Sequence, residues 1–403
     1  MIPIEEAKAI VLESVEPLEP KRIDLDECIG LVDAEDIASD RDYPPFDKAM
    51  MDGYAVCAAD LAEVPKRLPI SGEVAAGEGS GALERGGCVR IMTGAPVPDG
   101  ADAVVPVEDA GELDGEVEFR YRPKRWANIA RQGEDRRAGE VVVPKGTVIG
   151  PVAIAAIASV GMTRPLVYPK PVIALITTGD EIVPFDGAPQ PTQIRDTNSH
   201  SLAAQAAMCG FRIRKIAHVA DDPDALRRSI AGALDECDVL ILSGGVSMGR
   251  YDYIPGVLED LGVERRFHKV FQQPGKPLWF GIKGRKPVFG TPGNPLATHV
   301  CFDQYILPAL WKMVGREDCR VPHSGVLTEA VSAKKSGRVR FMLGFARLVD
   351  GRFEIAPLVG SGSADIFTTV RANAIFRLNP GERREAGDEV MFTFLGGREG
   401  GTL

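Results

Sequence analysis

The chain has 403 residues, of which 44% are hydrophobic and 26% are charged, and its formal net charge is −10. This length exceeds what one hydrophobic core serves and suggests about three or four domains of an ordinary globular protein. The negative charge argues against a nucleic-acid groove, which needs a basic face. It permits an anionic small molecule held by backbone N–H groups and a few lysines.

The cysteines and the N-terminus indicate the compartment. The seven cysteines are scattered and form neither a C-x-x-C pair nor a zinc-finger spacing, so we expect reduced thiols. The acidic, amphipathic N-terminus is wrong for a signal peptide. No apolar run approaches the roughly 18 residues of a membrane span. We therefore expect a soluble cytoplasmic protein without nucleic-acid or membrane partners.

The first half of the chain predicts one helix followed by a β-rich region. Apolar residues recur at helical spacing over residues 3–16. From about residue 40 to 136, short apolar stretches alternate with Gly, Pro and Asp turns, which is typical of a compact β domain. Residues 146–162 predict a second helix, capped by Gly161.

The second half alternates strands with helices. The alternation predicts a mostly parallel sheet covered on both faces, hence a three-layer αβα domain. The expected strands are 171–179, 211–221, 238–245 and 286–290, and the expected helices are 198–210, 222–237, 254–262 and 295–315. Asn198 or Ser199 is the expected N-cap of the first of these helices. After residue 317, short strands and turns predict a small C-terminal β domain.

Three of the expected strands end in small or hydroxyl-bearing residues. In an open α/β sheet, ligands bind beyond these carboxyl ends, and glycine and hydroxyl groups there suit a phosphate or another oxyanion. The three ends are "LITTGDE", "LILSGGVSMG" and "VFGTPGNP". None of them is a P-loop or a G-x-G-x-x-G sequence. Lys276 lies between Pro274-Gly275 and Pro277, a rigid setting that favours a fixed cation.

Acidic residues form the other half of the pattern. Each of them alone is more often structural: an Asp-Gly pair marks a turn, and "DDPDAL" suits a helix start. The acids in question are Asp52, Asp135, Glu181, Asp222 and Asp252. Carboxylates and a phosphate repel each other in one site, and Mg²⁺ removes that cost because it prefers such hard ligands. The residues alone therefore suggest Mg²⁺-dependent chemistry on a phosphate ester or pyrophosphate.

Seven motifs in a fixed order give a family resemblance. They are "PPFDKAMMDGYAV", "RIMTGAPVPDGADAVVPVED", "NIARQGEDRRAGE", "ITTGDEIV", "SGGVSMGRYDY", "PGKP" and "FGTPGNP". In this order the chain closely resembles the molybdopterin molybdenumtransferase family, of the MoeA and gephyrin E-domain type. The resemblance covers nearly the whole chain, including "GSGSADIFTTVRANA".

The resemblance implies a fold and an activity. The activity is the last step of molybdenum cofactor synthesis: adenylylated molybdopterin and molybdate give the cofactor and AMP, with Mg²⁺. The fold is an elongated homodimer with a cleft completed by the partner subunit, and a transient contact with the molybdopterin adenylyltransferase is consistent with it. We expect a linking α/β domain of residues 1–38 and 137–168, a β-rich inserted domain of 39–136, an αβα molybdopterin-binding domain of 169–316, and a barrel-like C-terminal β domain of 317–403.

The motifs also transfer roles to individual residues. Active-site residues would be Asp52, Thr93, Asp135, Glu181 and Asp252, with Glu181, Asp252 and Asp135 as metal ligands. Residues that bind the pterin, the phosphate or other anions would be Ser243, Gly244, Gly245, Ser247, Lys276, Pro292, Pro295 and Asp222. Where the family commonly has Lys or Arg before P-G-K-P, this chain has Gln273, and Lys269 or Arg250 is a candidate replacement.

Two other functions stay open at this point. The first is a pterin-binding scaffold without catalysis, against which the intact set of acids argues. The second is a related Mg²⁺-dependent hydrolase of another dinucleotide pyrophosphate. Release of AMP from adenylylated molybdopterin alone separates the transferase from this hydrolase.

Overall fold

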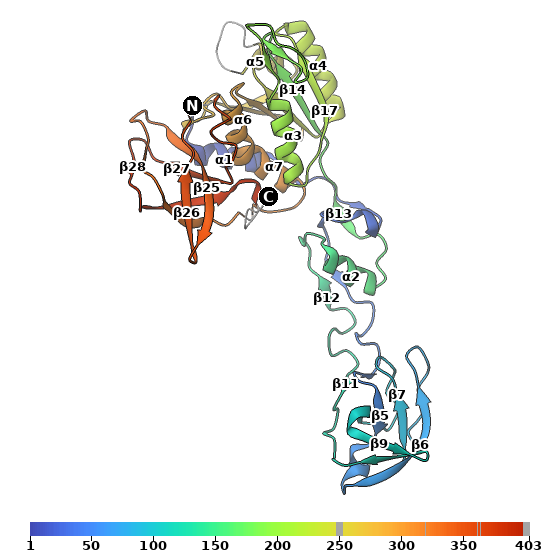
Figure 1. The fold of residues 1–403 in the computed structure, drawn as a ribbon. Coiled ribbons are helices and arrows are strands. Elements are labelled where there is room, and N and C mark those ends of the chain that lie inside the picture. The colour runs from blue at the N-terminus through green and yellow to red at the C-terminus, as the bar shows by residue number, and fades with distance from the viewer. Residues whose placement is uncertain (247–252, 319, 361, 363, 398–403) are drawn as a thin grey trace. The chain divides into compact units, whose positions relative to one another are not determined.

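The chain divides into two compact units (Figure 1). The computed structural model describes residues 1–246, 253–318, 320–360, 362 and 364–397. The first unit comprises Met1–Lys21, Gly30–Ala34 and Val167–Leu403, and the second comprises Arg22–Ile29 and Glu35–Leu166. Each unit buries its own clusters of hydrophobic side chains. Ser247, Arg250 and Asp252 of the predicted site lie outside the described residues.

The second unit is built mainly of β-strands, as the short apolar stretches predict. Its largest sheet has the strand order β8 (Ala103–Pro106), β5 (Gly53–Val56), β7 (Cys88–Ile91), β6 (Lys66–Val74), β10 (Glu116–Phe119) and β9 (Ala110–Leu113). Two short antiparallel pairs join β4 (Lys48–Ala49) to β11 (Ile129–Ala130) and β3 (Ile37–Ala38) to β12 (Val141–Val143). A small sheet of β1 (Lys21–Arg22), β13 (Leu166–Tyr168) and β2 (Val32–Asp33) lies at the boundaries of the units along the chain.

The helix expected over residues 146–162 is shorter than predicted. Helix α2 spans Pro151–Ser159, with Pro151 in its first turn, where proline has no N–H to leave unpaired. Gly161 follows its end with a φ of +71°, a conformation that glycine adopts without steric cost. The apolar pattern continues beyond the helix at both ends, so the pattern located the helix but overestimated its length.

The first unit contains a six-stranded mixed sheet. The strand order is β17 (Ile213–Val219), β14 (Ile173–Thr178), β18 (Val239–Ser243), β22 (Lys286–Thr291), β21 (Trp279–Lys283) and β19 (Glu264–His268). The first four strands are parallel, as expected, and every residue of β14 and β18 is buried. The last two strands extend the predicted parallel sheet: β21 pairs antiparallel with β22, and β19 pairs antiparallel with β21.

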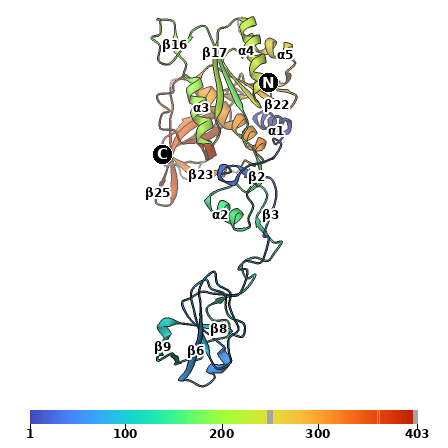
Figure 2. The same cartoon turned by 90° about the vertical axis from the view of Figure 1, so that its right-hand side faces the viewer.

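Helices cover both faces of this sheet, which confirms the three-layer αβα prediction (Figures 1 and 2). On one face, side chains of β14, β18 and β22 pack against α1 (Ile4–Ser14), α3 (Asn198–Met208), α6 (Pro295–Cys301) and α7 (Leu307–Met313). On the other face, alternate side chains of the same strands pack against α4 (Pro223–Glu236) and α5 (Ile254–Asp260). The carboxyl ends of four parallel strands therefore meet at one edge of the layer.

The long helix expected over residues 295–315 contains an irregular turn. One π turn, Phe302–Ile306, separates α6 from α7, and all five of its side chains are buried. Pro308 lies in the first turn of α7 and has no N–H to donate to the carbonyl four residues earlier. A widened turn accommodates this missing bond, so a π turn just before Pro308 has a local cause.

The C-terminal part of the first unit is a closed barrel of five strands. Its order is β25 (Val339–Val349), β26 (Arg352–Pro357), β23 (His323–Leu327), β29 (Glu389–Phe394) and β27 (Ala374–Leu378), and β27 pairs with β25 to close it. Strand β20 (Gln272–Gln273) adds to the edge of β25, and β24 (Val331–Ser332) pairs with β28 (Arg383–Arg384). The predicted barrel-like β domain is confirmed.

The barrel packs directly on the αβα layer. Phe341, Leu343 and Ile375 of the barrel belong to the same buried cluster as the residues of α7.

Two short strands, β15 (Ile182–Val183) and β16 (Ile194–Arg195), follow β14. Within the described residues, no helix has both the length and the apolar character that a bilayer crossing requires.

Candidate functional site

In the second unit, three of the recognised motifs meet around Asp52. Strand β4 of the "PPFDKAMMDGYAV" motif pairs with β11 of the "NIARQGEDRRAGE" motif. The carboxylate Oδ1 of Asp52 accepts two hydrogen bonds from Thr93 of the third motif, from the backbone N–H at 2.6 Å and from Oγ1 at 2.8 Å. These two bonds lower the pKa of Asp52, whose side chain is exposed. Two predicted site residues are thus joined, and the acid is held in its ionised form.

Gly53 explains why an Asp-Gly pair begins a strand here and does not form a simple turn. A Cβ atom at Gly53 would lie 2.0 Å from the carbonyl oxygen of Val105 on the neighbouring strand β8. Only glycine fits this approach, and the close pairing fixes the backbone that immediately follows Asp52.

Asp135 is exposed on a neighbouring loop of the same unit. Its backbone N–H donates to the carbonyl oxygen of Tyr43 at 3.0 Å, and the Gln132 N–H donates to the Asp47 carboxylate at 2.8 Å. These bonds hold the loop of Asp135 beside the start of the Asp52 motif. No described contact joins the Asp135 carboxylate to Asp52 or Thr93.

In the first unit, the ends of the parallel strands are held together by Asn198. Its side-chain Nδ2 donates to Ser243 Oγ at 2.9 Å and to the Gly293 carbonyl oxygen at 2.8 Å. The bonds link α3, the end of β18 and the loop after β22. The sequence makes Asn198 an N-cap candidate, but Thr197 occupies that position. The side chain of Asn198 instead connects two of the predicted ligand loops.

The glycines after β18 are required by the backbone. Gly244 has a φ of +98°, and a Cβ there would lie 2.6 Å from the Thr178 carbonyl oxygen. Gly245 has a φ of +60°, and a Cβ there would lie 2.9 Å from Ile254 Cδ1 and 3.0 Å from Thr178 Oγ1. The Gly244 N–H donates to the Thr291 carbonyl, and Ser243 is buried. The backbone N–H of Gly244 is therefore used within the fold, whereas Gly245 is partly exposed.

Two predicted acids lie near this strand edge with different surroundings. Asp222 is the N-cap of α4, and its Oδ1 accepts from the Ala225 N–H at 2.7 Å. This is the structural role that the "DDPDAL" sequence suggested. Glu181 is exposed and follows Gly179, where a Cβ would meet its carboxylate at 2.5 Å. Both side chains are exposed, but the Asp222 carboxylate is engaged in capping α4.

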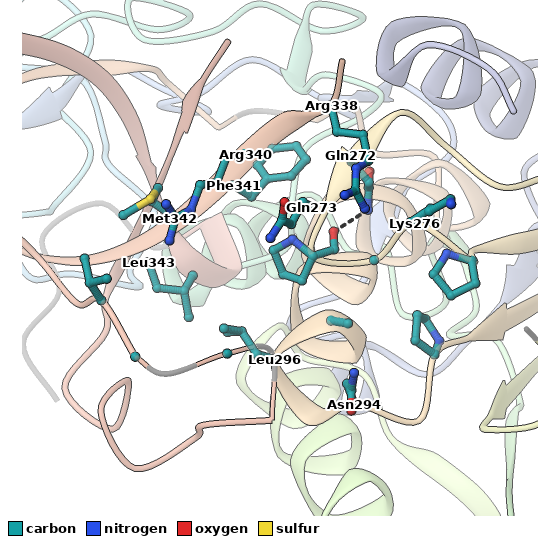
Figure 3. A pocket seen from close by; sticks show the side chains of 18 of the residues that line it. Gln272, Gln273, Lys276, Asn294, Leu296, Arg338, Arg340, Phe341, Met342 and Leu343 are labelled. Carbon is teal, nitrogen blue, oxygen red and sulfur yellow. Dashed lines mark hydrogen bonds between the residues drawn. The ribbon is translucent and has the colours of Figure 1, made fainter. Parts of the chain in front are cut away.

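A cationic pocket of about 300 Å³ opens between the sheet edge and the barrel (Figure 3). Lys276, Pro292, Asn294 and Leu296 line it from the sheet side, and residues of β25 line it from the barrel side. Pro295, the first residue of α6, follows directly after Asn294. None of the described lining residues is acidic. Lys276 and Pro292, two predicted anion-site residues, thus share one cavity.

The pocket also contains two arginines that sequence reasoning missed, Arg338 and Arg340. Strand β20 pairs with β25 so that Gln273 lies opposite Arg340. Arg340 donates to the Ser332 carbonyl at 2.7 Å, whereas neither Lys276 nor Arg338 has a carboxylate partner within the described part of the chain. Lys269 is not among the lining residues. Arg338 and Arg340 therefore supply positive charge where the chain has Gln273.

The described residues do not assemble a metal centre. No group of three or more His, Cys, Asp or Glu side chains with metal-binding geometry occurs among them. Of the predicted ligands, Glu181 belongs to the first unit, Asp135 belongs to the second, and Asp252 is outside the described residues.

Three family models match successive parts of the chain. Residues 2–161 match the MoeA N-terminal region (domain I and II), and residues 174–312 match a probable molybdopterin binding domain. Residues 324–395 match the MoeA C-terminal region (domain IV). The Asp52 motifs lie in the first match, the strand-end loops and Lys276 in the second, and Arg338 and Arg340 in the third.

Curated relatives and solved structures agree with these matches. A molybdopterin molybdenumtransferase from Bacillus subtilis is 32% identical over 98% of this chain and 94% of its own length. One from Synechococcus elongatus is 38% identical over 78% of this chain and 80% of its own. The crystal structure of a molybdopterin biosynthesis MoeA protein from Pyrococcus horikoshii superposes with a TM-score of 0.84, at 31% identity, over 98% of this chain and 99% of that one.

Proposed function

The chain belongs to the molybdopterin molybdenumtransferase family, and from this we propose that it inserts molybdate into adenylylated molybdopterin with release of AMP. The step completes molybdenum cofactor biosynthesis. Attack of water on the phosphoanhydride yields AMP and leaves one phosphate on the pterin. The protein needs no nucleophile of its own for this reaction, so its contribution is to bind, orient and stabilise charge.

The cationic pocket is the observation that supports this proposal best. Molybdate is an oxyanion, and a cavity lined by Lys276 and Arg338 without a described acidic residue favours such a ligand over a cation or a neutral molecule. The pocket adjoins the loop after β22, at the strand edge where α/β sheets bind their ligands. We propose that the pterin phosphate binds along Gly245 and Ser247, with Ser243, Gly244, Pro292 and Pro295 shaping the loops.

The other predicted active-site residues, Asp52, Thr93 and Asp135, belong to the second unit. Their side chains are exposed, Thr93 donates to Asp52, and the backbone of Asp135 is bonded next to the start of the Asp52 motif. We propose that they act in a cleft of a homodimer together with Glu181, Asp222 and Asp252. The four-domain division of the chain, a cytoplasmic location and a transient contact with the molybdopterin adenylyltransferase are parts of the same proposal.

Mg²⁺ is the proposed cation of this reaction, held by Glu181 and Asp252 and, in the assembled site, by Asp135. The exposed carboxylate of Glu181 is a hard ligand of the type that Mg²⁺ prefers. When bound, the cation would offset the negative charge of the phosphoanhydride. The described residues alone do not form a complete Mg²⁺ site. The proposed function therefore rests on the cationic pocket and on the loops around Asp52.

A reconstitution experiment tests the proposal. The purified chain is incubated with adenylylated molybdopterin, Mg²⁺ and molybdate, and AMP and active cofactor are measured. We expect both products, and we expect Asp252→Asn to fold normally without forming them. AMP release from common dinucleotides would favour the pyrophosphate hydrolase instead. Tight pterin binding without AMP release would favour the scaffold.

A further inference from the structure

A buried hydrogen-bond chain runs from the π turn to the loop that bears Lys276. The phenol of Tyr305, in the π turn, donates to Gln272 Oε1. The amide Nε2 of Gln272 in turn donates to the carbonyl oxygen of Pro274 at 3.1 Å, which is the dashed line in Figure 3. Tyr305 is 1% exposed and Gln272 is fully buried, so water does not compete for these bonds.

The chain of bonds has one direction. The Pro274 carbonyl can only accept, so Gln272 must present its amide nitrogen to Pro274 and its oxygen to Tyr305. Burial raises the pKa of the Tyr305 phenol, which therefore remains a donor at neutral pH. The orientation of the Gln272 side chain is thus fixed at both ends.

The loop of Lys276 rests directly on this amide. Gly275 has a φ of +91°, and a Cβ there would lie 2.4 Å from Gln272 Nε2 and 2.8 Å from Cys301 Sγ. The Lys276 carbonyl accepts from the Val270 N–H at 2.9 Å, so its backbone is held on the other side as well. The backbone of this loop is therefore closely packed against Gln272 and cannot shift towards it. The exposed side chain of Lys276 extends from this fixed backbone.

The π turn makes this contact possible, because its three polar side chains reach three different elements. Asp303 binds Arg320, and Gln304 accepts from Lys8 Nζ of α1 at 2.7 Å. Only Tyr305 reaches β20. Gln304 therefore offers a matched control: it is buried in the same turn, and its amide is bonded to Lys8 and to Asp303, so its contacts lead away from the pocket.

We propose that Tyr305 and Gln272 are positioning residues that set the location of the Lys276 ammonium in the oxyanion pocket and thereby the affinity for molybdate. This inference rests on the proposed function. Tyr305 does not line the pocket, and Gln272, which does line it, has its amide oxygen bonded to Tyr305 and its amide nitrogen bonded to Pro274. Both act through the backbone of Pro274 and Gly275, so their loss changes where Lys276 lies and leaves its charge intact.

The experiment compares molybdate saturation of cofactor formation in Tyr305→Phe, Gln304→Met and Lys276→Ala. We expect Tyr305→Phe to raise the molybdate concentration for half-saturation by about tenfold, since small misplacements of a binding group have large effects. Its maximal rate should change little, and Gln304→Met should keep the normal half-saturation even if it melts earlier. In the Lys276→Ala background, Tyr305→Phe should add nothing further, because both changes remove one contribution.

The outcomes separate the two proposals. If Lys276→Ala leaves molybdate saturation unchanged, the oxyanion pocket of the proposed function is wrong. If Lys276→Ala shifts it but Tyr305→Phe does not, only the positioning inference is wrong. Equal shifts in Tyr305→Phe and Gln304→Met would assign the effect to general loosening of the turn and would also overturn the inference. Because Tyr305→Phe could fold poorly, Gln272→Glu provides a second test: it keeps the acceptor for Tyr305, loses the donor to Pro274, and should raise the half-saturation too.

Discussion

The Asp52 carboxylate and Thr93 are joined by a two-point contact, in which both the backbone N–H and the hydroxyl of Thr93 donate to the same oxygen. The contact connects two motifs that lie 41 residues apart in the chain. It keeps an exposed carboxylate ionised and oriented without burying it. Such an acid is suited to interact with a substrate or a cation that arrives from outside its own unit.

Replacing Thr93 by Val should raise the pKa of Asp52, because the hydroxyl donor is lost while the backbone donor stays. NMR titration of the Asp52 carboxyl carbon measures this directly. We expect the rate of AMP formation to fall about threefold to tenfold, since one of two bonds to the charged group remains. Thr93→Ser keeps the hydroxyl and serves as the control. An unchanged Asp52 pKa in Thr93→Val would contradict the assignment.

The same contact predicts how stability depends on pH. The pKa of Asp52 is lower in the folded chain than in the unfolded one, so its contribution is present above the unfolded pKa. That contribution disappears as the pH falls through the folded pKa. Denaturation of Thr93→Val should therefore show a weaker loss of stability on acidification than the unaltered chain. A steeper loss would contradict the sign.

The positive charge of Arg338 should strengthen the binding of molybdate in the pocket. We expect Arg338→Ala to raise the molybdate concentration for half-saturation by about tenfold, as loss of one charge-assisted bond does. Arg338→Lys should recover part of the affinity, since a lysine keeps the charge but not the planar fork. Calorimetric titration with molybdate provides the measurement. Arg347, on an exposed part of β25, is the matched control, and Arg347→Ala should bind normally.

Gly275 should not tolerate a methyl group. We expect Gly275→Ala to cost about 2–4 kcal/mol in unfolding free energy, because the strained φ and the collision with Gln272 add together. Gly284 has a φ of +62°, but a methyl group there would meet no atom within 4 Å, so Gly284→Ala should cost only about 1 kcal/mol. Urea denaturation measures the unfolding free energy of both variants. Gly284→Ala reports the backbone strain alone, and Gly275→Ala reports the strain together with the collision. Equal losses would exclude a role for the collision.

Removing one partner of the buried ion pair between Asp303 and Arg320 should strongly destabilise the fold. Both side chains are less than one-tenth exposed, with Asp303 3% and Arg320 8% accessible. Arg320→Met leaves a buried carboxylate without its cation and should cost about 3–5 kcal/mol. Arg347→Met, which breaks an exposed pair with Glu354, should cost less than about 1 kcal/mol. Thermal and urea unfolding of the two variants provide the comparison.

Local patterns in the sequence predicted those parts of the fold that local patterns determine. The buried strands β14 and β18 are continuous apolar runs, and Pro223 marks the first turn of α4 behind its Asp222 cap. Strands β19 and β21 were not predicted. Charged residues such as Glu264 and Arg265 interrupt the apolar pattern of β19, whereas β21 is a short apolar run with a glycine in its middle. Their place in the sheet depends on pairing with β22.

The pocket arginines illustrate what the sequence conceals. Arg340 lies opposite Gln273 only because β20 adds to a barrel strand that begins 66 residues later. No local sequence pattern near either residue predicts this pairing. The alternation of Arg338 and Arg340 with Val339 and Phe341 indicates only that this segment is a strand. The sequence around Asn198 indicates a capping role, but its contacts with Ser243 and Gly293 depend on three separate loops.

The π turn before Pro308 also limits how the gene can change. A deletion of one codon between residues 301 and 307 would restore an uninterrupted helix. The two halves would keep their relative rotation, because five residues of a π turn and four residues of an α-helix turn the chain about equally far, but the turn would have one position fewer for its polar side chains. Asp303, Gln304 and Tyr305 would then no longer face their partners simultaneously. The number of residues in this segment is therefore constrained. Natural variation here should consist of substitutions and not of insertions or deletions.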